Sequence, residues 1–346
     1  MKSAASVGKV KDLTGPGITD RFGAACTDLG ASVRAPDGHL VSVFGDTFSG
    51  HRVGAGDWRS PVILIGTGDA THPIVYSHAG GADRRYARQL WHYRRRPNPG
   101  LLRRGISTVI PSDLLRVDDS LYLHAIVNRG FGNVVWTEIW RSDDNGKSWR
   151  QPGNGSKFPA DQYGGHAQCW TWDYDPADGW VYVVSTGFQR DKGLILRRVR
   201  PEHIADRDRY QAWGDGRWGS RATVITPPGE TWGELSLRRF DCGTWVLGGF
   251  LSSSYALGYR TLRNLTGDLG RSPVQRPIAG CTWEDEDHTT GCRVAQLYGG
   301  YLLPGSRLDA AGGVGLVVSQ WNTARGWPYR VMQFRVTLRD TTRDAQ

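Results

Sequence analysis

A β-hairpin is encoded by residues 28–48, DLGASVRAPDGHLVSVFGDTF, and its pattern recurs along the chain. Leu29–Arg34 predicts one strand, and His39–Phe44 alternates in the manner of a second. Between them, residues 35–38 (Ala-Pro-Asp-Gly) have the composition of a tight turn. This stretch therefore predicts a short antiparallel pair of strands with an aspartate near each outer end.

Those two aspartates, Asp28 and Asp46, are equidistant from a turn centred near Asp37. Directly opposed residues in such a pair have Cβ atoms about 5 Å apart. Two carboxylates at that distance repel, which raises the pKa of one and leaves the other ionised. Such a pair suits a general acid and a nucleophile or base. Alternatively, both are turn aspartates that bond to nearby backbone.

The chain repeats this hairpin at intervals of roughly 55 to 85 residues, at or above the spacing of propeller blades. Each repeat has a short strand that opens near a polar residue, a Gly- or Asp-rich turn, and a strongly apolar second strand. The predicted pairs are 28–30 with 40–44, 112–115 with 120–127, 168–172 with 179–184, 234–237 with 244–249, and 296–299 with 315–319.

Five such repeats predict an all-β, five-bladed β-propeller of four-stranded blades. We expect one domain over residues 15–338, an N-terminal extension over 1–14 and a C-terminal tail over 339–346. The first strand of each blade lines the central channel, so the residues that open these strands should converge on one funnel. The opening residues are Asp28, Asp113, Gln168, Glu234 and Gln296.

Composition agrees with this fold, because 46 glycines and 15 tryptophans suit many tight turns around aromatic packing. Residues 201–210 (Pro201 to Tyr210) are the best helix candidate. Residues 142–149, SDDNGKSW, resemble the Asp-box turn on the outer part of propeller blades, with its Trp packed beneath. Because that turn occurs in sialidases and in non-catalytic propellers, it indicates fold rather than chemistry.

Several functional classes are disfavoured. The net charge is +9, but the basic residues are scattered and the longest basic run is 94–96, so we expect no nucleic-acid partner. The five cysteines have no CxxC and no His at zinc spacing, so we expect neither metal nor cofactor. Cys281 and Cys292 flank a polar loop and could pair in an oxidising compartment.

No segment approaches about eighteen consecutive apolar residues, so we expect no membrane span. The first eight residues lack the apolar run of a signal peptide. We expect a monomer that stays in the cytoplasm or leaves by another route, such as host lysis or virion assembly.

Six motifs in order resemble one family: TDLG at 27–30, FGDTF at 44–48, IPSD at 110–113, GFQR at 187–190, GELS at 233–236 and VSQWN at 318–322. Together they resemble domain-of-unknown-function family 4185, whose members are classed as glycoside hydrolase family 183, the endo-D-arabinanases. The similarity covers about residues 15–338. Cys26 and the loop from Cys281 to Cys292 fit none of these motifs, which leaves substrate preference open.

The resemblance implies a five-bladed propeller that cleaves internal α-1,5 linkages between D-arabinofuranose units. Its substrates would be mycobacterial arabinogalactan and lipoarabinomannan. It also implies that the aspartates matching Asp28 and Asp46 are the catalytic pair.

The other candidate residues for substrate binding each have a structural alternative. Asp113 and Glu234 either orient substrate hydroxyls and tune the pair, or bond to neighbouring backbone. Gln168, Gln296 and His166 either face the funnel or satisfy internal hydrogen bonds. Aromatic faces suit sugar rings, so Trp232 and Trp321 either stack on the substrate or belong to the core. Gln320, in the last motif, completes the set.

Two further functions remain open: a sialidase-like propeller glycosidase and a non-catalytic glycan-binding propeller, for instance in a phage tail. A sialidase would need an Arg triad and a Tyr nucleophile, and no Tyr–Glu arrangement stands out.

For the arabinanase, direct opposition in a hairpin favours the carboxyl separation of about 5 to 5.5 Å found in retaining enzymes. It predicts Asp28 as nucleophile and Asp46 as acid/base. A bulge near Gly30 or Gly45 would shift the register, and Asp113 or Glu234 could instead supply the acid.

Overall fold

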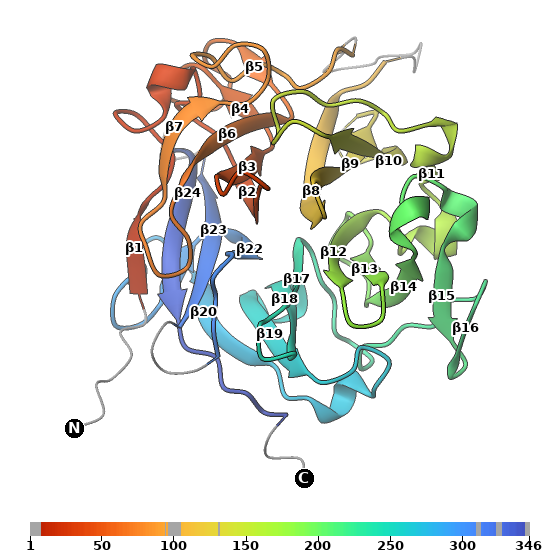
Figure 1. Ribbon diagram of the computed structural model, residues 1–346. Helices are drawn as coiled ribbons and strands as arrows, with labels where there is room; N and C mark the ends of the chain where they lie inside the picture. Colours follow the sequence, from red (N-terminus) through yellow and green to blue (C-terminus); the bar gives the residue numbers. More distant parts are fainter. Residues whose placement is uncertain are drawn as a thin grey trace.

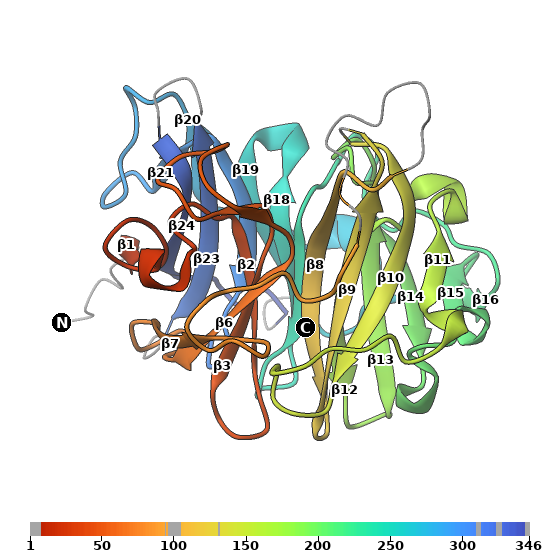
Figure 2. The same ribbon diagram turned by 90° about the horizontal axis from the view of Figure 1, so that it is seen from above.

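Five β-sheets stand around a central axis in the computed structural model, which describes residues 8–93, 95, 105–130, 132–308, 313–322 and 327–342 (Figure 1). The innermost strands pack against their neighbours in a closed ring, and the strands run between the two faces of the disc (Figure 2). The predicted all-β, five-bladed propeller is confirmed.

The innermost strands all come from the predicted repeats. They are β2 (Leu29–Arg34), β8 (Thr108–Val117), β12 (Cys169–Asp175), β17 (Leu235–Arg239) and β22 (Leu297–Leu302). Outside β2, blade one has β3 (Leu40–Phe44), β6 (Val62–Thr67) and β7 (Val75–Ala79), with a separate pair, β4 (Thr47–Phe48) and β5 (Trp58–Arg59). Blade two continues with β9 (Ser120–Asn128), β10 (Val134–Ser142) and β11 (Lys157–Pro159).

Blades three and four each have five strands. Blade three continues with β13 (Trp180–Thr186), β14 (Ile195–Val199), β15 (Gln211–Gly214) and β16 (Arg217–Gly219). Blade four continues with β18 (Trp245–Leu251), β19 (Ala256–Leu262), β20 (Gln275–Cys281) and β21 (Arg293–Ala295). Blade five continues with β23 (Val314–Asn322), β24 (Trp327–Val336) and β1 (Gly8–Asp12).

The N-terminal strand closes the ring. β1 pairs antiparallel with β24 and forms the outermost strand of blade five, as Figure 1 shows. Leu13 is buried in the core, and the hydroxyl of Thr14 accepts a hydrogen bond from the Val331 amide at 3.1 Å. The predicted boundary at residue 15 therefore lies inside the propeller, since residues 8–14 are part of its last blade.

Large apolar side chains fill the space between adjacent blades. Trp170 and Trp172 of β12 pack with Leu115 of β8 and Ile139 of β10, and all four are almost fully buried. Blades diverge outwards from the channel, so bulky rings are needed to fill the wedge between them. Four of the tryptophans that the structure describes are buried in the core in this way: Trp170, Trp172, Trp232 and Trp245.

The Asp-box turn forms as predicted after β10. The carboxylate of Asp144 accepts from the Ser148 amide at 2.8 Å and from the Ser142 hydroxyl at 2.8 Å. The Trp149 indole donates to the carbonyl of Gly146 at 3.2 Å. Asn145 in this turn has a φ of 61°, a left-handed value that Asn tolerates.

A buried carboxylate ties three inner strands together. Asp113 lies within β8 and is fully buried, so it is not the residue that opens this strand into the funnel; Thr108 holds that place. Its two oxygens accept from Arg238 of β17, both at 2.8 Å, and one also accepts from the Thr171 hydroxyl of β12 at 2.7 Å. Asp113 is therefore structural, and its expected contact with substrate is wrong.

Two smaller expectations also change. Residues 201–210 contain only two 3-10 turns, Pro201–His203 and Arg207–Arg209, rather than a helix of two or three turns. Cys281 and Cys292 are free thiols. In the parallel pairing of β20 with β21, Cys281 lies beside Ala295, three positions from Cys292. That offset is about 10 Å along a strand, beyond the reach of a disulfide.

We expect Asp113→Ala to lower the free energy of unfolding by about 3–5 kcal/mol, because it leaves the guanidinium of Arg238 without its carboxylate in a buried site. Urea unfolding followed by tryptophan fluorescence measures this change. Asp118→Asn is the matched control, since Asp118 lies in the exposed turn after β8 and Asn tolerates its φ of 50°. Equal stability of the two variants would contradict the structural role of Asp113.

Candidate active site

Two β-bulges in the hairpin of blade one determine where its aspartates lie. Leu29 pairs with Phe44 and Ala31 pairs with Val43, so Gly30 is an extra residue on β2. Leu29 and Gly30 have φ of 67° and 107°, which turns the backbone sharply at this point. Bulges of this kind redirect side chains and occur often beside active sites.

The register beyond the bulge separates the two aspartates. The amide of Gly45 donates to the carbonyl of Asp28 at 3.1 Å, so Asp28 lies opposite Gly45 and not opposite Asp46. Further along, Cys26 bridges to Phe48, which leaves an extra residue on the strand that carries Asp46. The prediction that Asp28 and Asp46 lie directly opposite each other is wrong by one residue. The bulge at Gly30 shifts the register of the two strands, as the sequence allowed.

Asp28 is enclosed on the side of blade five. Its Oδ2 accepts from the Tyr298 hydroxyl of β22 at 3.1 Å, whereas its Oδ1 has no hydrogen-bond partner in the part of the chain that the structure describes. A Cβ at position 45 would lie 2.5 Å from that Oδ1, so Gly45 leaves the space that this carboxyl group fills. Burial, followed by the charge of Asp46, raises the pKa of Asp28 well above its usual range.

Asp46 is held on the opposite side, by blade two and by β5 of its own blade. Its Oδ1 accepts from the Thr108 hydroxyl of β8 at 2.9 Å and from the Trp58 indole of β5 at 3.1 Å. Burial raises the pKa of Asp46, but these two hydrogen bonds and the charge of Arg95 oppose that rise. The pKa of Asp28 is therefore raised further than that of Asp46, so Asp46 is the more readily ionised of the two.

The order of the two pKa shifts is the opposite of the order that the expected roles require. A buried carboxyl group with a strongly raised pKa is suited to donate a proton, and a hydrogen-bonded, partly exposed carboxylate is suited to act as nucleophile or base. In this site Asp28 has the first set of properties and Asp46 has the second.

An ion pair stands beside Asp28 on the side of blades three and four. Glu234, just before β17, accepts from Arg190 Nη2 at 2.5 Å. The guanidinium of Arg190 lies 5.1 Å from the ring centroid of Phe250 and 5.5 Å from that of Tyr298. Glu234 raises the pKa of Asp28 and Arg190 lowers it, so the pair adjusts the charge around the buried acid.

Two tyrosines that the sequence reasoning missed line the site. Tyr298 is almost fully buried, and burial followed by the charge of Asp28 raises its pKa well above the usual range. Tyr329 is also buried, and its ring stacks with that of Phe48 at a centroid distance of 6.4 Å. Alternation along the inner strand could have indicated Tyr298, because it lies two residues after Gln296. No sequence signal pointed to Tyr329.

Two predicted contact residues lie in the interior instead. Trp232 is fully buried in the core between blades three and four and presents no face to a sugar ring. Gln320 is also buried; its amide donates to Glu286 and to the carbonyl of Ala295, and its oxygen accepts from Arg330. Both expectations of substrate contact are therefore wrong, because neighbouring strands cover these side chains.

The remaining candidates lie at or near the openings of inner strands. Gln168 bonds to the Ala160 carbonyl at 2.9 Å and to the Phe188 amide at 3.0 Å, so it fixes loops at this face. His166 bonds to the Tyr163 carbonyl at 2.9 Å and is partly exposed.

Gln296 and Trp321 differ in exposure. Gln296 is exposed at the start of β22. Trp321 is half-buried, with its ring centroid 5.3 Å from that of Tyr329. A stacking role for Trp321 stays a prediction.

The fold and the site define a five-bladed β-propeller that carries two carboxyl groups of unequal acidity at one mouth of its channel. Within the described ranges, no group of three or more His, Cys, Asp or Glu side chains is arranged to hold a metal ion. None of the helices that the structure describes is long and apolar enough to cross a membrane.

The chain belongs to the family described as Domain of unknown function (DUF4185), whose model matches residues 14–335. It is 30% identical over 335 residues to an uncharacterized 35.9 kDa protein of Mycolicibacterium smegmatis, covering 92% of this chain and 94% of that one. It is also 30% identical over 321 residues to notoamide biosynthesis cluster protein J' of Aspergillus versicolor, covering 88% and 83%.

Solved structures share the fold at low sequence identity. A putative hydrolase from Bacteroides ovatus aligns with a TM-score of 0.59 and 13% identity, covering 91% of this chain and 87% of the other. The α-L-arabinanase of Cellvibrio cellulosa aligns with a TM-score of 0.52 and 12% identity, covering 92% and 97%. A GH43_1 enzyme from Xanthomonas citri aligns with a TM-score of 0.53 and 12% identity, covering 94% and 90%.

We expect Asp28→Asn to stabilise the protein at neutral pH. An acid whose pKa is higher in the folded state than the unfolded value of about 3.9 makes the protein less stable as the pH rises above that value. The neutral amide removes this loss. The melting temperature of Asp28→Asn should exceed that of the wild type at pH 7–8, and the difference should vanish near pH 4. A constant difference across this range would contradict the raised pKa.

Proposed function

We propose that this protein is an endo-acting glycoside hydrolase that cleaves α-1,5-linked D-arabinofuranan of mycobacterial arabinogalactan and lipoarabinomannan. The observation that carries the proposal is a pair of carboxyl groups in unlike settings. Asp28, with one oxygen that has no partner in the described structure, keeps its proton to higher pH, whereas Asp46, which accepts from Thr108 and Trp58, is the first to ionise. Glycoside hydrolysis needs these two forms of a carboxyl group on either side of one bond.

The substrate class rests on resemblance. The motifs at 27–30, 44–48 and 187–190 are similar to those of endo-D-arabinanases, and they contain Asp28, Asp46 and Arg190 of this site. Two solved propellers of similar fold are described as arabinanases. The substrate is a cell-envelope polysaccharide, so we propose that the protein acts there, whether released or associated with a virion.

In the proposed reaction, Asp28 donates its proton to the glycosidic oxygen as the bond from that oxygen to C1 breaks. The carboxylate of Asp46 forms a bond to C1, giving a covalent glycosyl–enzyme ester. Asp28, now ionised, takes a proton from a water molecule that attacks C1, and the ester bond to Asp46 breaks. Two displacements at C1 retain the anomeric configuration.

Neighbouring side chains assist each role. Thr108 and Trp58 donate to one oxygen of Asp46, which orients its carboxylate. Tyr298 donates to Asp28 and stabilises its charge after the proton leaves. Burial, followed by the charge of Asp46, raises the pKa of Asp28, which keeps this acid protonated before the first step. Retention stays a prediction, now without the support of direct strand opposition.

The sialidase-like alternative is disfavoured by the state of Tyr298. This tyrosine does lie near Glu234 and Arg190, but its hydroxyl donates to Asp28 and its pKa is strongly raised. A nucleophilic tyrosine would need the opposite shift. A non-catalytic binding propeller would retain affinity for arabinan but release no products.

We expect Asp28→Asn and Asp46→Asn each to lower arabinan hydrolysis by about 10³-fold or more, because each removes a proton donor or a nucleophile. The measurement is the release of short arabino-oligosaccharides from purified arabinogalactan. Asp118→Asn is the control and should match the wild type. Near wild-type turnover in either site variant would remove that residue from the mechanism, and a wild type that yields no products would refute the proposed function.

We expect the first-formed product to keep the anomeric configuration of the substrate, as followed by NMR at early times. Azide should rescue Asp46→Ala with formation of a glycosyl azide of inverted configuration, since the anion replaces the missing nucleophile. An inverted sugar as the first product of the wild type would exclude the covalent step.

A further inference from the structure

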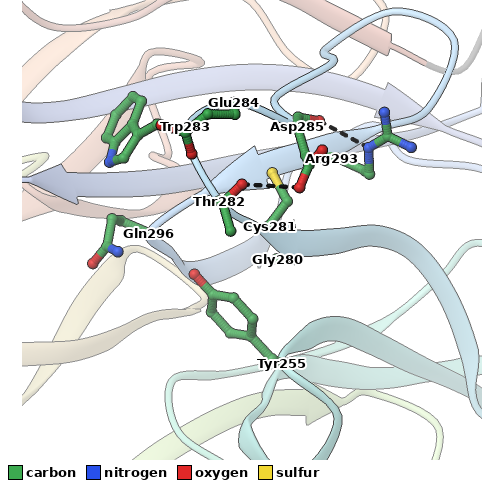
Figure 3. Close-up of a pocket in the computed structure, with 9 residues that line it drawn as sticks. All are labelled: Tyr255, Gly280, Cys281, Thr282, Trp283, Glu284, Asp285, Arg293 and Gln296. Carbon is green, nitrogen blue, oxygen red and sulfur yellow. Dashed lines mark hydrogen bonds between the residues drawn. The ribbon is translucent and has the colours of Figure 1, made fainter.

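A surface pocket of about 700 Å³ lies on blade four, where the chain passes from β21 to β22 (Figure 3). Its walls come from the β18–β19 connection, the end of β20, the loop that follows it, and the opening of β22. The lining residues are Tyr255, Gly280, Cys281, Thr282, Trp283, Glu284, Asp285, Arg293 and Gln296.

The pocket is joined to the catalytic pair through one inner strand. Gln296, which directly precedes β22, is one of the residues that line the pocket (Figure 3). Tyr298, two residues further along β22, donates its hydrogen bond to Asp28. A polysaccharide bound across the mouth of the channel at Asp28 therefore meets this pocket where it leaves the site past the opening of β22, over blade four.

An aromatic ring is held in place at the floor of the pocket. Tyr255 is 40% exposed, although its ring packs edge-on against Phe250, with centroids 6.2 Å apart. A Cβ on residue 280 would lie 2.5 Å from the Tyr255 ring, so Gly280 provides the space that the ring occupies. The ring is fixed on one side and open to the pocket on the other.

The backbone at this pocket is strained. Tyr255 and Gln296 have φ of 46° and 52°, values that bulky residues rarely adopt outside functional sites. Such strain persists only where the surrounding structure enforces it. Both residues line the same pocket (Figure 3).

The chemistry of the lining fits a neutral, hydroxyl-rich ring. Tyr255 offers an apolar face, and Gln296 and Thr282 offer hydrogen-bonding groups. The acidic residues Glu284 and Asp285 disfavour a polyanion. Sugar rings combine an apolar face with a rim of hydroxyls, which matches this arrangement.

We propose that this pocket is a distal subsite that binds one arabinofuranose residue of the substrate chain, several units from the cleaved bond, with Tyr255 as its stacking platform. The proposal rests on the proposed function, since it assigns a second contact to the same polysaccharide. A contact of this kind lets the enzyme prefer long chains and cut within them.

The test uses Tyr255→Asn, because Asn tolerates the left-handed backbone while removing the ring. Tyr255→Phe keeps the ring, and Val75→Asn is the matched surface control, since Val75 is 53% exposed on β7 of blade one. Kinetics on α-1,5-D-arabino-oligosaccharides of increasing length give kcat/KM for each chain. Affinity electrophoresis in gels containing arabinan measures binding in the inactive Asp46→Asn background.

We expect the ratio of kcat/KM for long to short oligosaccharides to fall about tenfold in Tyr255→Asn, which corresponds to about 1.4 kcal/mol of lost binding. Tyr255→Phe and Val75→Asn should keep the wild-type ratio. Retardation by arabinan should also weaken when Tyr255→Asn is added to Asp46→Asn.

An unchanged ratio with unchanged retardation would overturn the subsite, even if the wild type cleaves arabinan. An equal loss on short and long chains would also overturn it, because it would indicate a general defect. A wild type that cleaves no arabinan while Tyr255→Asn weakens retardation would refute the proposed function and leave the pocket as a binding site.

Discussion

The structure depends on one buried carboxylate that three inner strands share. Asp113 accepts two hydrogen bonds from Arg238 of blade four and one from Thr171 of blade three, while its own strand belongs to blade two. Removing one partner of a buried ion pair leaves an uncompensated charge. The resulting loss of folding free energy is far larger than the stabilisation that an exposed ion pair contributes. These hydrogen bonds fix how the inner strands of blades two, three and four pack together, and therefore how the residues at the openings of these strands are placed.

The sequence was sufficient to predict the repeat, the number of blades and the paired strands of each, because alternation and turn residues are local properties. It also predicted that Asp28 and Asp46 are neighbours, and their catalytic roles stay a prediction. It named Gly30 and Gly45 as places where a bulge would shift the register, but it could not show that the bulge at Gly30 forms, because a strand that contains a glycine can be either regular or bulged. Asp113 and Gln320 were misplaced for another reason: the side chains that cover them come from strands far away in the sequence.

The chemistry of the site follows from the different surroundings of two carboxyl groups, those of Asp28 and Asp46. Asp28 has one oxygen without a partner in the described structure, whereas one oxygen of Asp46 accepts from Thr108 and Trp58. Burial raises the pKa of both groups, and the hydrogen bonds to Asp46 oppose that rise, so the surroundings, and not the residue type, decide which group keeps its proton. Tyr298 and Thr108 come from neighbouring blades, so the site exists only when blades one, two and five are in contact.

The closure of blade five by β1 has a consequence for how the chain folds. β1 can pair only after β24 has emerged from the ribosome, so the earliest of the described strands waits for the latest of them. Contacts between such distant segments slow folding, and strands with unpaired edges associate with other chains in the meantime. Yield in a cell should therefore respond to chaperone supply and growth temperature more than the equilibrium stability of the finished ring would suggest.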